Sequence, residues 1–176
     1  MKTFRSIVVL KRPRDELWTI MRDHLPEFAS SVADIEEVRE VERRPESQNL
    51  VHIVNEWRAR QQIPPPIRTM LKLDDISWID RNRWHTETGI CSWSIEPNFL
   101  ADFIACSGET AFAEAMGGRG SRVTFTGTLE LRPGLLGALG SVEPVISGFV
   151  ESIVGAVIPH NLRAVVEAAA AFRLPG

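Results

Sequence analysis

Up to residue 131 the chain alternates apolar and polar side chains over short stretches, and this two-residue period is typical of strands with one buried face. It predicts strands over residues 3–11, 35–44, 49–60, 71–80, 83–93, 101–114 and 122–131. Apolar residues at helical spacing instead predict two short helices over 15–23 and 25–31. Turn-forming residues separate strands at 45–49, at 80–82 and at 117–120. The pattern therefore indicates an antiparallel sheet with two small helices inserted after its first strand.

The last third of the chain is apolar and punctuated by glycines, with only Glu143 and Glu151 charged between residues 132 and 160. A membrane-spanning helix needs about 20 predominantly apolar residues with few or no charges, and both glutamates interrupt this segment. We therefore expect a soluble helix that begins near Ser141 as its N-cap and is kinked at Pro159. Such a helix must bury its apolar face against the sheet or line a cavity within it.

Glycines in that helix need a reason, because glycine costs about 1 kcal/mol relative to alanine inside a helix. Close packing on the sheet is one reason, and space for a cavity beside Gly148 and Gly155 is another.

Earlier in the chain, residues 63–67 read Ile-Pro-Pro-Pro-Ile. Proline lacks a backbone N–H and cannot continue a strand ladder, so we expect a stiff connector there that marks a crossing or a lid.

Composition narrows the class of protein. The 176 residues are 44% hydrophobic and carry a net charge of −3, which fits one domain over residues 1–176 and gives no attraction to nucleic acid. Two cysteines and a charged N-terminal segment without an apolar run argue against a secreted disulfide scaffold, so we expect a cytoplasmic protein. A transient membrane contact stays open, because leucines at 135, 136 and 139 precede the terminal helix.

Several chemistries have no sequence support. The two cysteines and four histidines lack the close pairing of a zinc site, so no metal is expected. Residues 117–121 lack the lysine of a phosphate-binding loop and lie between strands. No Gly-x-Ser-x-Gly segment occurs to anchor a hydrolase triad.

The order of elements, the Leu17-Trp18 pair in the first small helix, and the hairpin over 108–130 before the terminal helix carry a family resemblance. On these features the chain resembles the START-like (SRPBCC) superfamily, the helix-grip fold shared by Bet v 1-type proteins, polyketide cyclases and lipid-transfer domains. The resemblance implies an α+β fold in which a curved antiparallel sheet of about seven strands wraps around a long C-terminal helix. It also implies a cavity between sheet and helix for a hydrophobic small molecule, without a cofactor.

Three polar residues are candidates for ligand binding, each with a simpler alternative. Asn55 shares the apolar face of its strand, where its amide could bind a ligand head group or a neighbouring backbone group. Arg68 follows the prolines, at a cavity mouth or on the surface. Glu109 is a carboxylate inside the cavity, unless its strand face points outward. Six further residues are expected to form the cavity wall: Trp57, Trp78, Trp84, Phe125, Phe149 and Ile153.

Two functional classes remain. The favoured one is a non-catalytic carrier or sensor of a lipid, isoprenoid or polyketide-like molecule. The alternative is a polyketide cyclase or aromatase that uses groups such as Glu109, His85 or Arg68 to move protons. The chain has no tyrosine and no clear acid/base pair on one inward face, which disfavours the enzyme. A protein-binding module of the co-chaperone activator type is a third, weaker reading.

Overall fold

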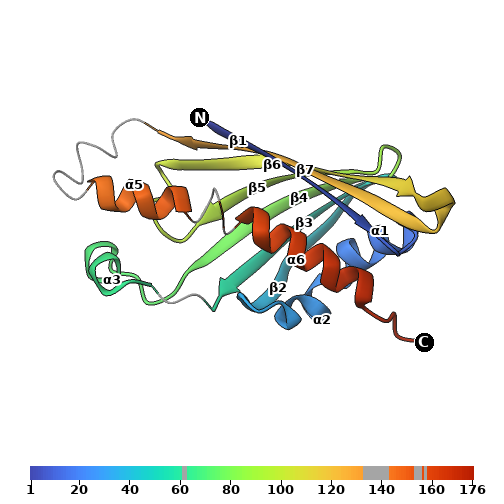
Figure 1. The fold of residues 1–176 in the computed structure, drawn as a ribbon, viewed down its shortest axis with the longest axis horizontal. Helices are drawn as coiled ribbons and strands as arrows, with labels where there is room; N and C mark the ends of the chain where they lie inside the picture. The colour runs from blue at the N-terminus through green and yellow to red at the C-terminus, as the bar shows by residue number, and fades with distance from the viewer. Residues whose placement is uncertain (61–62, 133–142, 153–155, 157) are drawn as a thin grey trace.

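The computed structural model describes residues 1–60, 63–132, 143–152, 156 and 158–176. Seven strands form one antiparallel sheet in the order β1-β7-β6-β5-β4-β3-β2 (Figure 1). The strands are β1 (Lys2–Leu10), β2 (Ile35–Ser47), β3 (Leu50–Ala59), β4 (Ser77–His85), β5 (Ile90–Pro97), β6 (Ile104–Ala115) and β7 (Gly120–Leu131). Each strand from β2 to β6 pairs with the strand that follows it in the chain, and β7 pairs with β1.

Two groups of helices cover the concave face of this sheet (Figure 1). After β1 come α1 (Arg14–Asp23), α2 (Leu25–Phe28) and the 3-10 turn η1 (Ala29–Ser31). The short helix α3 (Pro65–Leu71) follows β3, and the turn η2 (Met116–Gly118) joins β6 to β7. The chain ends with α5 (Glu143–Ser152) and α6 (Ile158–Ala171). The expected helix-grip architecture, a curved seven-stranded sheet around the C-terminal helix with short helices after the first strand, is confirmed.

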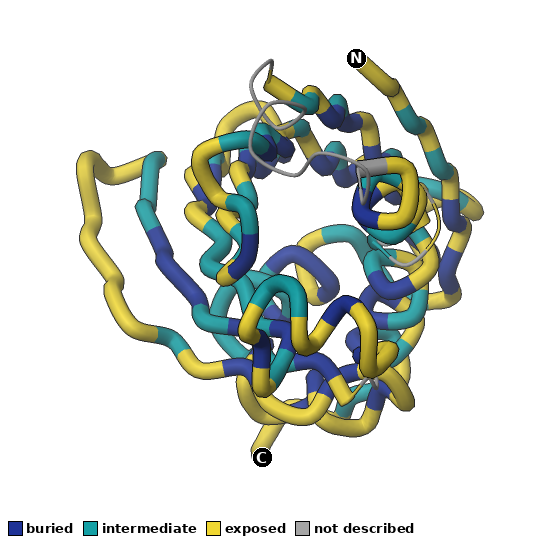
Figure 2. The backbone as a smooth tube through the Cα atoms, turned by 90° about the vertical axis from the view of Figure 1, so that its left-hand side faces the viewer, coloured by how far each residue is buried: buried dark blue, intermediate teal, exposed yellow. Residues whose placement is uncertain are grey.

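The strand register decides which side chains point inward. Buried residues alternate with exposed ones along the strands, as Figure 2 shows from the end that carries α3 and α5. Across the sheet, Asn55 on β3, Asp80 on β4, Ile95 on β5 and Cys106 on β6 are successive partners and therefore share the concave face. This row crosses the middle of the sheet.

The interior consists of two apolar clusters. One surrounds Trp18 and Trp84 under α1 and α6, and the other contains Ile67, Phe99 and Ile146 under α3 and α5. Trp78 and Leu162 pack against both clusters, and the candidate site lies where the clusters meet. No helix among the described residues is long and apolar enough to cross a membrane.

Two paired glycines let aromatic rings lie close to the sheet. Gly108 on β6 faces Gly127 on β7, and a methyl group at either position would collide with its surroundings. At Gly127 the obstacles are the rings of Phe4 and Trp93, whose centroids are 6.1 Å apart. The indole N–H of Trp93 donates to Thr110 Oγ1 at 3.1 Å, which fixes the ring against the glycines.

The structure corrects three sequence-based boundaries. Residues 80–82 are not a turn, because β4 runs through them and the chain reverses at residues 86–89, where Gly89 has a φ of +66°. Residues 65–71 form the helix α3 instead of a proline connector, since proline is accepted in the first turn of a helix. Residues 45–47 extend β2 and are not part of a turn.

The described residues of the terminal segment form the helices α5 and α6. Pro159 lies in the first turn of α6, where its missing N–H costs nothing. Gly148 is exposed on α5 with open space around it, so neither of the two reasons considered for a glycine there, close packing on the sheet or space for a cavity, applies. Ser141, Gly155 and the leucines at 135, 136 and 139 lie outside the described residues. An ion pair of 3.1 Å between Lys2 Nζ and Glu151 Oε2 links α5 to β1.

Candidate ligand-binding pocket

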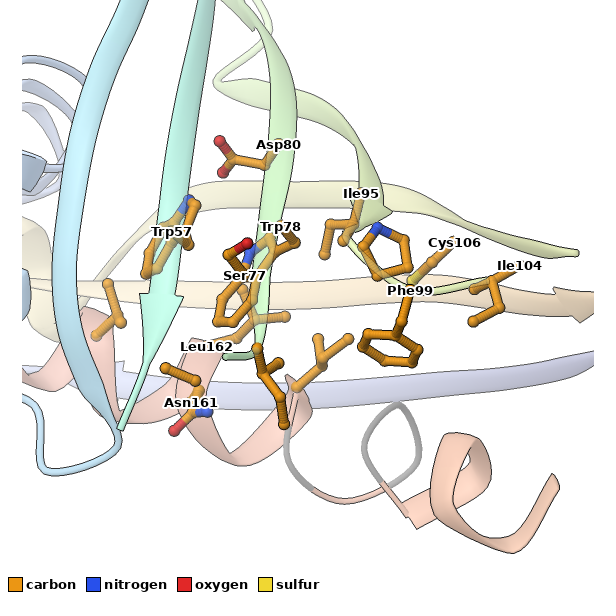
Figure 3. A pocket seen from close by; sticks show the side chains of 15 residues that line it. Trp57, Ser77, Trp78, Asp80, Ile95, Phe99, Ile104, Cys106, Asn161 and Leu162 are labelled. Atoms are coloured by element: carbon orange, nitrogen blue, oxygen red, sulfur yellow. The ribbon is translucent and has the colours of Figure 1, made fainter. Parts of the chain in front are cut away.

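An apolar pocket lies between the concave face of the sheet and α6, with a cavity volume of about 70 Å³ (Figure 3). Strands β3 to β6, the segments on either side of them, and the first half of α6 supply its walls. The lining residues are Trp57, Ala59, Ile76, Ser77, Trp78, Asp80, Ile95, Pro97, Phe99, Ile104, Cys106, Ile158, Asn161, Leu162 and Val165. Asp80 is the one ionised side chain of this set at neutral pH.

Two stacked indoles form one wall of the pocket. Trp57 and Trp78 are directly opposite each other on β3 and β4, and their ring centroids are 5.6 Å apart with the planes 13° from parallel. Stacked aromatic pairs contribute about 0.5–1.5 kcal/mol beyond the area that they bury. The pair therefore gives the pocket a rigid, flat, apolar surface.

Asp80 lies beside this wall among the residues that line the pocket, and it is half-buried (Figure 3). The backbone N–H of Asn55 donates to Asp80 Oδ1 at 3.2 Å. Burial raises the pKa of Asp80 from 3.8 to about 6, while the nearby polar groups of Asn82, Trp57 and Asn55 act in the opposite direction. The carboxyl group is thus ionised at neutral pH and gains a proton in mildly acidic solution.

Two other polar atoms at the pocket are buried without a hydrogen-bond partner among the described residues. They are Trp57 Nε1, which favours the charged form of Asp80 but has no acceptor in good geometry, and Asn161 Oδ1 on α6. In Figure 3 the nitrogen end of the Trp57 ring lies on the side of Asp80, and Asn161 lies at the opposite end of the pocket. A buried polar group without a partner costs about 1–3 kcal/mol, so each of these atoms lowers the stability of the interior.

The structure brings some of the sequence-predicted residues together. Trp57 and Trp78 line the pocket. Asn55 is buried next to the pocket, and its backbone N–H, not its side-chain amide, donates to Asp80 Oδ1 at 3.2 Å. The two alternatives for its amide, a ligand head group or a neighbouring backbone group, therefore stay predictions. Phe149 on α5 does not line the pocket, but its ring packs 5.9 Å from that of Phe99, which does. Ile153 lies outside the described residues.

Four other predicted residues lie elsewhere. Trp84 packs edge-on against Trp18 with centroids 5.0 Å apart, and Phe125 is 1% exposed in the same cluster, so both belong to the packed core. Glu109 is exposed on the outer face, because Cys106 and Thr110 occupy the inward positions of β6. Arg68 is exposed on α3. Of the two alternatives for Glu109, the outward-facing one therefore agrees with the structure, and Arg68 does not line this pocket.

Sequence reasoning missed Asp80, the main polar group of the pocket, because it placed a turn at 80–82. A signal was present: Trp78, Asp80, Asn82 and Trp84 keep a two-residue period across the supposed turn. His85, considered for proton transfer, follows this series on the other face, where its Nε2 lies 3.4 Å from Ser92 Oγ. It does not line the pocket.

For a bound ligand, the pocket provides an apolar environment that excludes water, a flat aromatic surface and one carboxylate. Among the described residues no three His, Cys, Asp or Glu side chains gather to hold a metal ion. Cys106 also lines the pocket, and burial raises the pKa of its thiol to about 11, so it remains an uncharged apolar group at neutral pH.

Comparison with known proteins places the fold. No protein-family model and no curated protein matches the chain. The Zhui aromatase/cyclase from Streptomyces sp. R1128 is similar over 97% of this chain and 92% of its own, with a TM-score of 0.66 and 16% identity. TTHA0849 from Thermus thermophilus is similar over 97% of this chain and 95% of its own, with a TM-score of 0.64 and 16% identity. The Bet v 1 allergen Ara h 8.0201 is similar over 97% of this chain and 99% of its own, with a TM-score of 0.61 and 12% identity.

At such low identity the likeness concerns the fold and not the ligand. It extends over nearly the whole of this chain and of each of the three structures. The sequence-based resemblance and the arrangement of sheet and helices agree with it. The chain therefore has the helix-grip fold of the START-like, or Bet v 1-like, superfamily.

Proposed function

We propose that this protein binds a small hydrophobic molecule in the pocket between the sheet and α6 and carries or senses it. The observation that supports this most strongly is the pocket itself, whose lining is apolar except for Ser77, Asp80 and Asn161. Apolar pockets with a few convergent polar groups are the usual form of small-molecule sites. The flat surface of Trp57 and Trp78 suits a ring or an extended hydrocarbon chain.

The size of the pocket limits the ligand. A cavity needs about 10–15 Å³ for one water, whereas drug-sized ligands occupy pockets of about 300–1,000 Å³. At about 70 Å³ the space accepts a single ring or a short alkyl chain without rearrangement. A full lipid or a polycyclic polyketide requires α5 and α6 to move away from the sheet.

A second function, a cyclase-type enzyme in the same pocket, gains one specific argument from Asp80. A general acid or base works best with a pKa near the working pH, and burial raises the pKa of Asp80 to about 6. The groups first considered for this role, Glu109, His85 and Arg68, do not line the pocket. The enzyme alternative therefore depends on Asp80.

Ligand retention tests the binding proposal. Protein purified without detergent is analysed by native mass spectrometry, and any retained molecule is extracted and identified. Leu162→Trp fills the pocket from α6, and Leu174→Trp places the same substitution at an exposed residue near the C-terminus. We expect a retained apolar molecule in the wild type and in Leu174→Trp, and none in a folded Leu162→Trp variant. Retention that is equal in all three proteins would contradict the proposed site.

Asp80→Asn then separates the two functions. A carrier keeps its ligand when this carboxylate is replaced by an amide of the same shape, or changes only its affinity. An enzyme that uses Asp80 for proton transfer keeps the ligand but loses conversion of it, measured by mass spectrometry of the recovered molecule. Unchanged conversion in Asp80→Asn would exclude the catalytic role.

A further inference from the structure

The Asp80 carboxylate has no cationic partner in the part of the chain that the structure describes. None of the residues that line the pocket is Lys, Arg or His, and no described ion pair includes Asp80. Neighbouring Arg81 and Arg83 alternate to the outer face, where they pair with Glu96 and Glu46. A carboxylate in a largely apolar pocket is costly unless it is paired, so this group favours an incoming positive charge.

The groups next to Asp80 also favour a positively charged ligand. The faces of aromatic rings carry negative potential and attract cations, and the stacked pair of Trp57 and Trp78 lies next to Asp80. Trp57 Nε1, a donor without a hydrogen-bond partner among the described residues, lies on the side of Asp80 and favours the charged form of this carboxylate. An anionic ligand would meet repulsion from Asp80 without any compensating cation.

We propose that the pocket selects small organic ammonium ions, primary amines with an aromatic or alkyl body, whose ammonium group donates to the Asp80 carboxylate while the body lies along Trp57 and Trp78. The inference rests on the proposed function, because it names the class of ligand for the same pocket. It accounts for the presence of a carboxylate among residues that otherwise exclude charge. A neutral alcohol of equal shape can donate a hydrogen bond to Asp80 but leaves its charge unpaired.

Few other titratable groups face Asp80. On β3 its neighbours are Asn55 and Trp57, on β5 Ile95, and on α6 the pocket residues are uncharged. The thiol of Cys91 is near enough for the Asp80 charge to matter, but burial raises the pKa of this thiol well above 9.0 and it stays neutral. The pH dependence of amine binding between pH 5 and 8 therefore reports Asp80 alone, since alkylammonium groups remain charged up to about pH 10.

The test uses three probes of nearly equal shape: 2-phenylethylamine, 2-phenylethanol and phenylacetate. Their affinities for the whole protein are measured by isothermal titration calorimetry at pH 7.5. We expect the amine to bind at least about tenfold more tightly than the alcohol, as a charge-assisted hydrogen bond provides, and phenylacetate to bind most weakly. In Asp80→Asn the preference for amine over alcohol falls to about twofold or less, whereas Glu109→Gln, an exposed carboxylate on the outer face, leaves it unchanged.

A measurement on the wild type makes the test independent of whether Asp80→Asn folds. Lowering the pH from 7.5 to 5 protonates Asp80 and should weaken amine binding about tenfold while alcohol binding stays constant. Equal binding of amine and alcohol in the wild type would overturn the ammonium inference and leave the pocket proposal intact. Binding of none of the three probes would overturn the ammonium inference, and the pocket proposal is then judged by ligand retention.

Discussion

Asn55 and Asp80 face each other across the β3–β4 ladder, and the backbone N–H of Asn55 donates to Asp80 Oδ1 at 3.2 Å. This pair places a hydrogen-bonded carboxylate at the edge of a largely apolar pocket. Burial raises the pKa of Asp80 to about 6, and the nearby polar groups of Asn82, Trp57 and Asn55 lower this pKa and so limit the rise. The balance between these effects can be measured.

Asp80→Asn should stabilise the protein at neutral pH. The folded-state pKa of Asp80, about 6, lies above the unfolded value of 3.8, so its ionisation costs no stability below pH 3.8 and increasingly destabilises the fold up to about pH 6. A pKa rise of this size corresponds to about 3 kcal/mol. We expect the free energy of unfolding of Asp80→Asn, relative to the wild type, to increase by about 2–3 kcal/mol from pH 4 to pH 7 in urea titrations.

Glu109→Gln is the matched control for this experiment, because it removes a carboxylate that is exposed on the outer face. Its difference from the wild type should remain within about 0.5 kcal/mol, as for most surface substitutions. A pH-independent difference between Asp80→Asn and the wild type would show that Asp80 is not desolvated in the folded protein.

Trp57→Phe should raise the pKa of Asp80. The substitution keeps an aromatic ring opposite Trp78 but removes the indole N–H, one of the groups that favour the charged carboxylate. The pKa is followed by the ¹³C chemical shift of the Asp80 carboxyl carbon during an NMR titration. Trp93→Phe is the control, since its N–H donates to Thr110 Oγ1 and not to Asp80; a similar rise in both variants would contradict the assignment.

Gly108→Ala and Gly148→Ala should have opposite effects on stability. A Cβ at Gly108 would collide with the carbonyl oxygen of Thr126 and the ring of Trp93, and overpacking of this kind costs about 1–3 kcal/mol. A Cβ at Gly148 meets open space on α5, where alanine gains up to about 1 kcal/mol over glycine. Thermal unfolding of both variants checks the signs, and destabilisation by Gly148→Ala would mean that this face of α5 is covered.

Both cysteines should resist alkylation in the folded protein at pH 8. Burial raises the pKa of Cys91 well above 9.0 and that of Cys106 to about 11, so little thiolate exists to react. We expect iodoacetamide to label both thiols only after urea unfolding, as counted by intact mass. Cys106 lines the pocket and Cys91 does not, so labelling of Cys106 alone in native protein, blocked by an added ligand, would reveal access to the pocket from solvent.

The sequence by itself determined most of the architecture. Period-two alternation predicted seven strands, and for β3 and β7 it also predicted which residues point inward. Successive side chains of a strand point to opposite faces, so a strand with one buried face alternates apolar and polar residues. Helical spacing around Leu17 and Trp18 predicted α1, and the apolar segment after residue 131 predicted one terminal helix with a kink at Pro159. These features depend on local periodicity and on neighbours in the chain.

Only the tertiary structure decided the site. The β3–β4 register places Asp80 beside Asn55 and Trp57, and the sheet carries Glu109 outward and Trp84 into the packed core. Asn161 reaches the pocket from a helix 81 residues further along the chain than Asp80. Alternation within a strand predicts which residues share a face. The burial and the pKa of a side chain depend on which distant elements pack against that face. Because the sequence analysis placed a turn at residues 80–82, it did not predict that Asp80 lies on the inward face of β4.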